Sequence, residues 1–346
     1  MATNNNKKPA PRHRTSLKDL ARELGVSIAT VSRALRSSPE IGKEMQQRVK
    51  ELAKLKNYRP NPFAQSLRRE APKIIGVVVP RLETHYYAAV LSGIEAEALK
   101  SGYSVISANS HEDFETETRA IDNFVSMHVE GVIACLAQTT TDYSHFEELA
   151  DMGIPLVFFG RTCLPEKFSS VKANGDEAAQ QATQHLIDTG SRRIAFVGGP
   201  NHLDMVRRRK HGYLEALREN RMPILREMVV CGKIDYLWAL ESTMQLLQRE
   251  DRPDAILAFN DIITFAAFTA IKQLGLRIPE DVALIGFTDD VHAAYVTPQM
   301  SAIQDQSHLM GERACKMLMK NIGGDQTIYH EIVPQEIVIR QTSAKK

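Results

Sequence analysis

An arginine and several small side chains lie together at the start of a short predicted helix. Ser27 can cap this helix, and its apolar face is formed by Val31, Ala34 and Leu35. Arg33 carries a planar fork of donors that can make two hydrogen bonds to one guanine. Four residues nearby complete this surface. They offer an apolar side chain, a small one or a hydroxyl group: Ile28, Ala29, Thr30 and Ser32. This set matches the chemistry of base edges in a DNA major groove.

A helix-turn-helix would hold that surface in place. Ser16 and Asp19 favour the start of a first helix, and Gly25 permits the turn that ends it. Apolar spacing predicts this helix and a third one, with Leu17, Leu20, Ala21 and Leu24 on the first and Met45, Val49, Leu52 and Ala53 on the third. Gly42 precedes the third helix and caps it less well than a Ser would. A surface helix of a protein-interaction module has similar spacing, so spacing alone leaves both functions open.

Charge is divided unevenly along the 346 residues. The net charge is only +1, but residues 1–70 hold sixteen Lys and Arg against six Asp and Glu. The remaining residues hold 27 basic against 36 acidic side chains. A cationic segment beside an acidic body favours a nucleic-acid partner, because binding to phosphates releases counterions. Charge alone leaves one alternative open, which is that this basic surface is simply solvated and binds no partner.

After Pro72, short β-branched runs alternate with segments of helix length. The runs are IIGVVV, YSVISA, GVIACL and PLVFFG, followed by RIAFVG, AILAF and VALIGF. This alternation predicts an α/β fold with parallel sheets covered by helices, in two successive halves. Such sheets bind ligands at the carboxyl ends of their strands, so a cleft between the halves is the expected site.

The sequence disfavours several other classes of protein. No apolar run reaches the roughly 18 residues of a membrane span, and the polar, basic start is unlike a secretory signal. No nucleotide-binding, hydrolase or metalloprotease motif appears. We expect a cytoplasmic, nucleoid-associated chain that is not an enzyme and uses no cofactor or metal. The chain has four cysteines, Cys135, Cys163, Cys231 and Cys315. They lack the spacing of metal ligands, and we expect them to be reduced structural thiols.

The stretch TSLKDLARELGVSIATVSRALRSSPEI, followed by NYRPNPFAQSLRR, resembles the amino-terminal segment of the lactose-repressor (LacI/GalR) family of bacterial transcription regulators. The resemblance implies a hinge helix over Asn61–Arg69 that folds when two subunits meet on operator DNA. In that arrangement Leu67 would lever apart the central base step from the minor groove, with Asn61, Ala64 and Arg68 also at the DNA. Nine residues are too few for a stable isolated helix, so this folding would need a partner.

Most of the remaining chain, from HYYAAVLSGIEAEALKSGY to the final QEIVIRQTS, resembles the effector-binding core of the same family, which is similar to periplasmic sugar-binding proteins. The resemblance implies that Tyr86 and Tyr87 line the cleft and stack on a sugar or base ring. It also implies that Arg209 and Asn260 supply hydrogen bonds there, with Asp261 following.

Two departures from the family pattern bear on the ligand. Gly160 and Thr288 occupy strand-end positions where the family often has Asp, and Arg161 and Asp289 lie just beyond them. Fewer carboxylates beside Arg161 and Arg209 would favour an anionic sugar derivative over a neutral sugar. The predicted effector-binding residues are therefore Tyr86, Tyr87, Arg161, Arg209, Asn260, Asp261, Thr288 and Asp289.

These patterns divide the chain into four parts. They are a basic tail expected to be disordered (1–14), a helix-turn-helix domain (15–60), a hinge helix and linker (61–70), and an effector-binding and dimerisation core (71–346). Within the core, one subdomain is expected over about 73–173 and 306–332, and the other over about 174–303 and 335–343. The expected architecture is a three-helix domain followed by a periplasmic-binding-protein-like core of two subdomains.

The sequence thus predicts a dimeric, ligand-responsive transcription regulator, most simply a repressor of carbohydrate-related genes. Two-fold symmetry requires a near-palindromic double-stranded operator, which Ser16 and Ser27 are also expected to contact. A small-molecule effector, expected to be a sugar or sugar derivative, would change the angle between the two halves of the core. Two alternatives remain open: a family regulator with a phosphocarrier-protein corepressor, and a small-molecule-binding protein that does not act on DNA.

Overall fold

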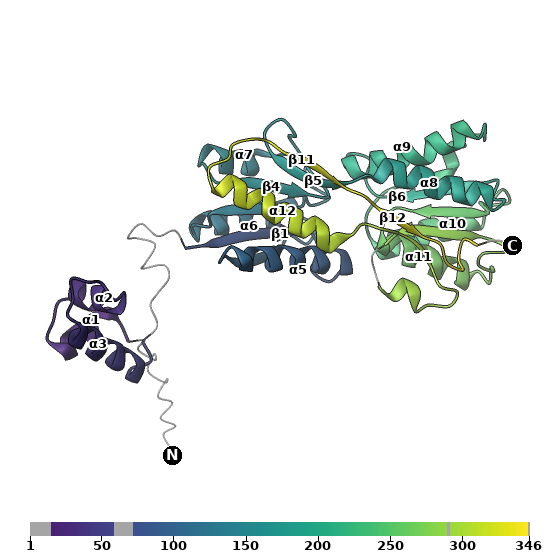
Figure 1. Ribbon diagram of the computed structural model, residues 1–346. Coiled ribbons are helices and arrows are strands. Elements are labelled where there is room, and N and C mark those ends of the chain that lie inside the picture. The colour runs from purple at the N-terminus through teal and green to yellow at the C-terminus, as the bar shows by residue number, and fades with distance from the viewer. Residues whose placement is uncertain (1–14, 59–71, 289–290, 345–346) are drawn as a thin grey trace, which may run out of the picture. The chain divides into compact units, whose positions relative to one another are not determined.

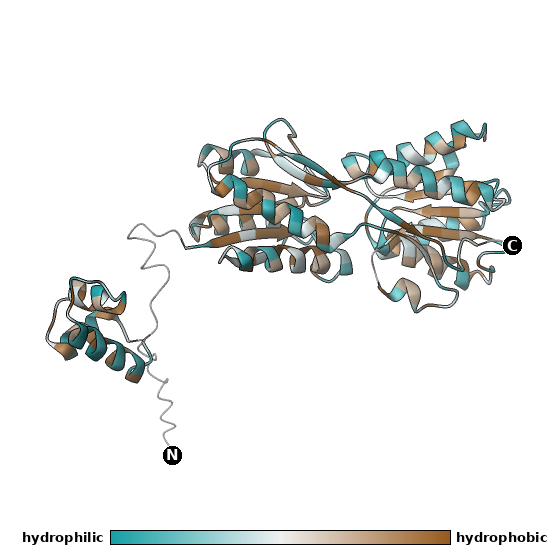
Figure 2. Ribbon diagram, viewed as in Figure 1, coloured by the Kyte–Doolittle hydropathy of each residue, from teal (hydrophilic) through white to brown (hydrophobic). Residues whose placement is uncertain are grey.

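The computed structural model describes residues 15–58, 72–288 and 291–344. It divides the chain into two compact units, Met1–Pro72 and Lys73–Lys346 (Figure 1). In both units the hydrophobic residues concentrate on the inner faces of helices, and in the second unit also in the central strands (Figure 2). Each unit therefore has a hydrophobic core of its own.

The first unit is a three-helix domain. Its helices are α1 (Leu17–Leu24), α2 (Ile28–Leu35) and α3 (Lys43–Leu55). Leu20, Val31, Ala34 and Val49 are fully buried between them. Leu35 is only half-buried, so the apolar face of α2 is narrower than predicted.

The ends of α1 and α2 have the predicted caps. The Ser16 hydroxyl oxygen accepts a hydrogen bond from the Asp19 backbone N–H (3.3 Å), and the Asp19 carboxylate accepts one from the Ser16 N–H (2.9 Å). Gly25 has a left-handed φ of 63°, which a side chain would strain. The Ser27 hydroxyl then accepts from the Thr30 N–H (3.0 Å) and starts α2. These local bonds fix the direction in which α2 leaves α1.

Gly42 offers no side-chain hydrogen bond at the start of α3, as predicted. The predicted tail (1–14) and the predicted hinge residues lie outside the described residues. The hinge residues concerned are Asn61, Ala64, Leu67 and Arg68.

One lobe of the second unit is built on a parallel six-stranded sheet in the order β11-β5-β4-β3-β1-β2. Its elements are β1 (Ile74–Val79), α5 (His85–Lys100), β2 (Ser104–Asn109), α6 (Phe114–Ser126), β3 (Gly131–Ala134), α7 (Ser144–Asp151), β4 (Leu156–Phe159), β5 (Ser169–Ala173), α12 (Ser307–Ile322) and β11 (His330–Val333). Val77 and Val79 belong to the core on one face of the sheet, and Val78 belongs to the core on the other. We call this part the first lobe.

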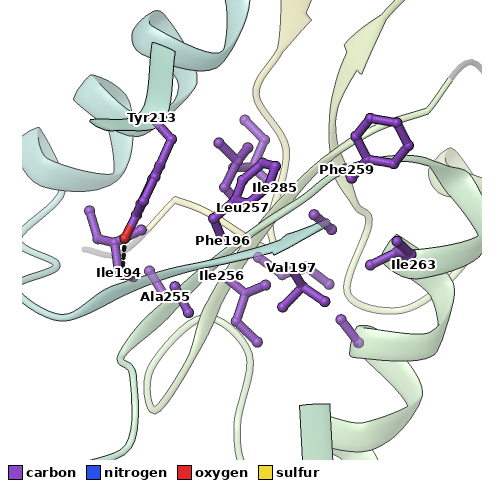
Figure 3. Packing of buried hydrophobic residues seen from close by; sticks show 14 of the residues in the cluster. Ile194, Phe196, Val197, Tyr213, Ala255, Ile256, Leu257, Phe259, Ile263 and Ile285 are labelled. Atoms are coloured by element: carbon purple, nitrogen blue, oxygen red, sulfur yellow. Dashed lines mark hydrogen bonds between the residues drawn. The ribbon is translucent and has the colours of Figure 1, made fainter. Parts of the chain in front are cut away.

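The second lobe has a six-stranded sheet in the order β12-β10-β9-β8-β6-β7. Its elements are α8 (Gly175–Asp188), β6 (Ile194–Gly198), α9 (Asp204–Glu219), η1 (Arg226–Met228), β7 (Val229–Cys231), α10 (Tyr236–Leu247), β8 (Ala255–Ala258), α11 (Asp261–Gln273), β9 (Ala283–Phe287), η2 (Val291–Ala294), β10 (Ser301–Gln304) and β12 (Glu336–Val338). Only β12 is antiparallel to its neighbour. Phe196 and Ile256 lie among its packed apolar residues, and the buried Tyr213 hydroxyl donates to the Ile194 carbonyl oxygen (2.9 Å; Figure 3).

The chain passes between the lobes three times, after β5, after β10 and after β11 (Figure 1). Each of the seven apolar runs singled out in the sequence contains a strand, whereas β5, β7, β10, β11 and β12 were not predicted. The missed strands are three to five residues long, and most contain polar residues. Such segments lack the continuous β-branched run that identifies a buried strand.

Glycines allow the helices of the first lobe to touch. A Cβ on Gly311 of α12 would lie 2.0 Å from the Val90 carbonyl oxygen of α5, and a Cβ on Gly93 of α5 would lie 2.1 Å from the His308 carbonyl oxygen of α12. Both neighbours are backbone atoms, so the helices would have to separate to admit a side chain.

Gly311→Ala should therefore destabilise the second unit by about 1–3 kcal/mol, the usual cost of overpacking a core. Urea denaturation of the full chain, followed by circular dichroism, measures the change. Lys316→Ala is the control, because Lys316 is exposed on the same helix. Equal stability of the two variants would contradict the close approach of α5 and α12.

Candidate functional site

A cavity lies in the second unit, where the carboxyl ends of strands from both sheets meet, and the space between its walls, open solvent included, is about 530 Å³. Parallel sheets bind ligands at this edge, because the strand-to-helix loops converge there. Its lining comprises Arg81, Thr84, Tyr86, Tyr87, Glu112, Arg161, Met205, Arg209, Ile234, Phe259, Asn260, Asp261, Ile262, Phe287, Thr288 and Asp305. We call it the main cavity.

The structure brings most of the predicted effector-binding residues together in this cavity. They are Tyr86, Tyr87, Arg161, Arg209, Asn260, Asp261 and Thr288. Asp289 lies outside the described residues. The lining residues that sequence reasoning did not single out include two carboxylates, Glu112 and Asp305.

Glu112 neutralises Arg161 in the wall of the first lobe. Its carboxylate accepts two hydrogen bonds from the Arg161 guanidinium (2.6 and 3.0 Å) and one from the Gln138 backbone N–H (2.8 Å). Burial is the largest single influence and lowers the pKa of Arg161. The charge and hydrogen bonds of Glu112, with Tyr87 and Cys135, together outweigh it, so the pKa is raised well above its ordinary value. Glu112 has a left-handed φ of 60°, so backbone strain accompanies the placement of this carboxylate.

Asp305 neutralises Arg209 in the wall of the second lobe. Arg209 Nη2 donates to both Asp305 oxygens (3.0 and 3.3 Å), and Nη1 donates to the Phe259 carbonyl oxygen. The guanidinium carbon lies 3.7 Å from the ring centroid of Phe287, in cation–π contact. Burial lowers the pKa of Arg209, and Asp305 opposes this only in part. Gln335 also donates to Asp305, which ties the second lobe to one of the three crossings.

The anionic ligand predicted from a shortage of carboxylates therefore rests on a wrong premise. Glu112 and Asp305 lie in the main cavity and neutralise the two arginines that were expected to attract an anion. Glu112 lies 49 residues before its partner and Asp305 lies 96 residues after its own. No local spacing in the sequence reveals pairs this distant.

Tyr86 and Tyr87 have different positions although they are adjacent. Their rings meet edge to face with centroids 4.9 Å apart. Tyr87 is buried, and burial raises the pKa of its hydroxyl well above the ordinary value. Tyr86 is half-buried and its hydroxyl lies 3.2 Å from the sulfur of Met310. Tyr86 is thus the better placed of the two to stack on a ligand, and Tyr87 supports it from the core.

Asn260 begins α11 and has two separable functions. Its side-chain oxygen accepts a hydrogen bond from the Ile263 backbone N–H (3.1 Å), which caps the helix. The cap uses only the oxygen, so the amide N–H groups can serve as donors toward the main cavity.

Few polar contacts join the lobes across the mouth of the cavity. Arg81 Nη2 donates to the Ile234 carbonyl oxygen over a long 3.4 Å, and the Ile234 N–H donates to the Gln138 side-chain oxygen (3.1 Å). His202 Nε2 lies 2.7 Å from the Gln138 carbonyl oxygen. A change of the angle between the lobes would break these contacts first.

In the first unit, α2 presents the predicted base-reading residues at or near the surface, with Ile28 in its first turn and Arg33 in its last. Ile28 is 43% exposed and the Arg33 side chain is 55% exposed. Ala29, Thr30 and Ser32 are half-buried. Arg33 forms an exposed ion pair with Glu40 (3.2 Å), a residue that the sequence did not single out. Such an exposed ion pair contributes little stability, so Arg33 can leave Glu40 for another partner at little cost.

No group of three or more His, Cys, Asp or Glu among the described residues is arranged to hold a metal ion. Across residues 15–58, 72–288 and 291–344, no helix is both long enough and apolar enough to cross a membrane.

Comparison with known proteins agrees with both units. The lacI family of bacterial regulatory proteins matches residues 16–61, and the periplasmic binding protein-like domain matches residues 183–343. The chain is 30% identical to catabolite control protein A of Priestia megaterium over 94% of this chain and 98% of that protein. It is 32% identical to the ribose operon repressor of Bacillus subtilis over 88% of this chain and 90% of that protein.

Among solved structures, the complex of the transcriptional regulator CelR with cellobiose is similar, with a TM-score of 0.73 and 28% identity over 95% of this chain and 100% of that one. A helix-turn-helix unit joined to a two-lobed, periplasmic-binding-protein-like core defines a DNA-binding transcription regulator with an effector-binding core. The chain belongs to the LacI family of bacterial regulators. The family and the fold predicted from the sequence are confirmed.

Glu112→Gln should destabilise the second unit by about 3 kcal/mol, because it leaves the buried Arg161 without a compensating charge. Urea denaturation of the full chain measures the loss. Glu83→Gln is the matched control, since the Glu83 side chain is 60% exposed in its pair with Arg81 and its change should cost less than about 1 kcal/mol. Similar stabilities of the two variants would contradict the structural role of the buried pair.

Proposed function

We propose that the chain is a homodimeric repressor of carbohydrate-related genes that binds a near-palindromic operator and is controlled by a small-molecule effector in the main cavity. Residues 15–60 would bind DNA, residues 61–70 would fold as the hinge helix on DNA, and residues 71–346 would sense the effector and dimerise. In this role the chain acts in the cytoplasm at the nucleoid and is not an enzyme. The observation that carries the proposal is the combination of a helix that presents Ile28 and Arg33 at the surface with a cavity at the strand ends of a two-lobed core.

The proposed DNA contacts divide into two kinds. Arg33 would read a base through its guanidinium, and Ile28 and Ala29 would fill space beside the base pairs. Polar contacts from the first unit would come from Ser16, Ser27, Thr30 and Ser32. The hinge contacts would come from Asn61, Ala64, Leu67 and Arg68. Symmetric half-sites follow from a two-fold dimer, because each subunit presents the same surface.

The proposed effector would lie beside Tyr86, against the wall of the second lobe that Arg209, Asn260 and Thr288 help to line. Because the lining comes from both lobes, a ligand would stabilise one angle between them over another. That preference is what couples effector binding to DNA affinity. The sugar names of two similar proteins, the ribose operon repressor and the CelR–cellobiose complex, support a sugar or sugar derivative.

Arg33→Ala should weaken binding to the operator by about 1–3 kcal/mol and leave binding to random DNA nearly unchanged. Fluorescence anisotropy with the chain's own upstream DNA and a scrambled duplex measures both affinities at several salt concentrations. Lys43→Ala, which removes an exposed charge at the start of α3, is the control and should weaken both DNAs alike. Equal losses on both duplexes for Arg33→Ala would refute its base-reading role. No preference of the unmodified chain for its upstream DNA would refute the proposed function.

Asn260→Asp should keep the stability of the second unit and weaken the effector response at least tenfold. The carboxylate oxygen can still cap α11, whereas the donor toward the main cavity is lost. A thermal-shift screen of sugars and sugar derivatives identifies a stabilising compound for the unmodified chain, and the same compound is then titrated against the variant. An unchanged response would show that Asn260 does not contact the effector.

A further inference from the structure

The loop that joins α2 to α3 places a carboxylate beside the predicted base-reading arginine. Arg33 lies in the last turn of α2, and Glu40 lies in the loop, before α3 begins. Arg33 Nη1 is 3.2 Å from Glu40 Oε2, and the two side chains are 55% and 67% exposed. The pair is therefore at the surface, where a DNA duplex can reach Arg33 without displacing any part of the core.

Hydrogen bonds from both neighbouring helices hold this loop in place. The Ser38 backbone N–H donates to the Arg33 carbonyl oxygen of α2 (3.0 Å). The Gln46 side-chain amide of α3 donates to the carbonyl oxygens of Ser38 (2.9 Å) and Ile41 (2.8 Å), which lie on either side of Glu40 in the sequence. The backbone that carries Glu40 is thus fixed by bonds that do not depend on the ion pair.

A carboxylate at a DNA-binding surface weakens general affinity. DNA phosphates repel it whatever the base sequence, and they do so in a unit whose other charges are mostly basic. Specificity, however, is a difference between two affinities, so a group that weakens the wrong complex more than the right one improves it. Glu40 meets this condition if its effect on Arg33 differs between a base contact and a phosphate contact.

The geometry of the pair produces such a difference. An unrestrained arginine occupies many rotamers, and its five N–H donors can bind any phosphate within reach. Glu40 contacts Nη1, which leaves Nε and Nη2, with their parallel N–H groups, for the two acceptors of a guanine. A guanidinium restrained in this way loses less entropy when it reads a base and has fewer donors for a phosphate.

We propose that Glu40 is a specificity-determining residue, which positions Arg33 for base reading and weakens its binding to phosphates. The inference rests on the proposed function, since it concerns the DNA contact proposed for Arg33. Glu40 acts through Arg33 and needs no base contact of its own. Because exposed ion pairs are weak, the effect is a severalfold change in discrimination between DNA sequences.

A double-mutant cycle on the full chain tests this role. It compares the unmodified chain with Glu40→Gln, Arg33→Ala and the variant that carries both changes. Glutamine keeps the length of the side chain and removes its charge, and the exposure of Glu40 means that the fold tolerates the change. Fluorescence anisotropy measures the dissociation constants for the chain's own upstream DNA and for a scrambled duplex, and their quotient is the specificity ratio.

Glu23→Gln is the matched control. Glu23 forms an exposed ion pair in the same unit, with its carboxylate 2.9 Å from Lys56 Nζ and its side chain 48% exposed. The substitution removes the same charge from the unit without touching Arg33. We expect it to leave the specificity ratio unchanged.

We expect Glu40→Gln to bind the scrambled duplex about threefold more tightly and the upstream DNA no more tightly than before, so that the specificity ratio falls about threefold, the effect of one exposed ion pair. In the Arg33→Ala background the same substitution should leave the ratio unchanged, because no guanidinium remains to be positioned. Tighter binding of Glu40→Gln to both duplexes by the same factor would overturn the proposal, since Glu40 would then act only by repelling phosphates.

An equal fall in the ratio with and without Arg33 would also overturn it, because Glu40 would then act independently of that residue. Either failure leaves the proposed function standing, provided that the unmodified chain prefers its upstream DNA and loses this preference in Arg33→Ala. Absence of any preference in the unmodified chain gives a different pattern and overturns the proposed function together with this inference.

Discussion

Two buried ion pairs, one in each lobe, hold the walls of the cleft in shape. Arg161 with Glu112 and Arg209 with Asp305 remove four charges from water, which is tolerable only with close geometry and further hydrogen bonds. Backbone groups complete both pairs, since Leu136 and Phe259 accept from the two guanidinium groups. The cavity is therefore built from charges that are largely neutralised within each lobe. A ligand is selected by the groups that these pairs leave available, and the presence of arginine alone says little about its charge.

The contacts across the cleft are weaker than those inside its walls. Hydrogen bonds through Ile234, Gln138 and His202 join the lobes at the mouth, and the Arg81 bond among them is long and partly exposed. The walls are rigid because their ion pairs are buried, whereas the mouth contacts can exchange with water at small cost. This difference favours motion of two rigid bodies about the crossings over deformation of the pocket.

The features that could be predicted from the sequence are those that depend on neighbouring residues and those that follow from resemblance to the family. Caps at Ser16 and Ser27 and the turn at Gly25 follow from local hydrogen bonds and backbone conformation, so their residue types identify them. Long apolar runs identified the central strands. Glu112 and Asp305 were missed, because an ion pair between distant segments leaves no spacing to read, and because Asp305 follows the short, partly polar strand β10. The seven described cavity residues came from family resemblance, and neither burial nor charge pairing could be assigned to them before the fold was known.

The order of the chain has a consequence for biosynthesis. The first lobe takes α12 and β11 from residues 307–333, although its other strands are complete by residue 173. Until those late segments leave the ribosome, the side of α5 that contains Val90 and Ile94 has no helix to cover it, and β5 has an unpaired edge. The nascent polypeptide thus presents an apolar surface and an open strand while the whole second lobe is being translated, the condition under which chaperones are needed. The chain crosses three times between the lobes. For the same reason the first lobe cannot finish folding before the second lobe has been translated.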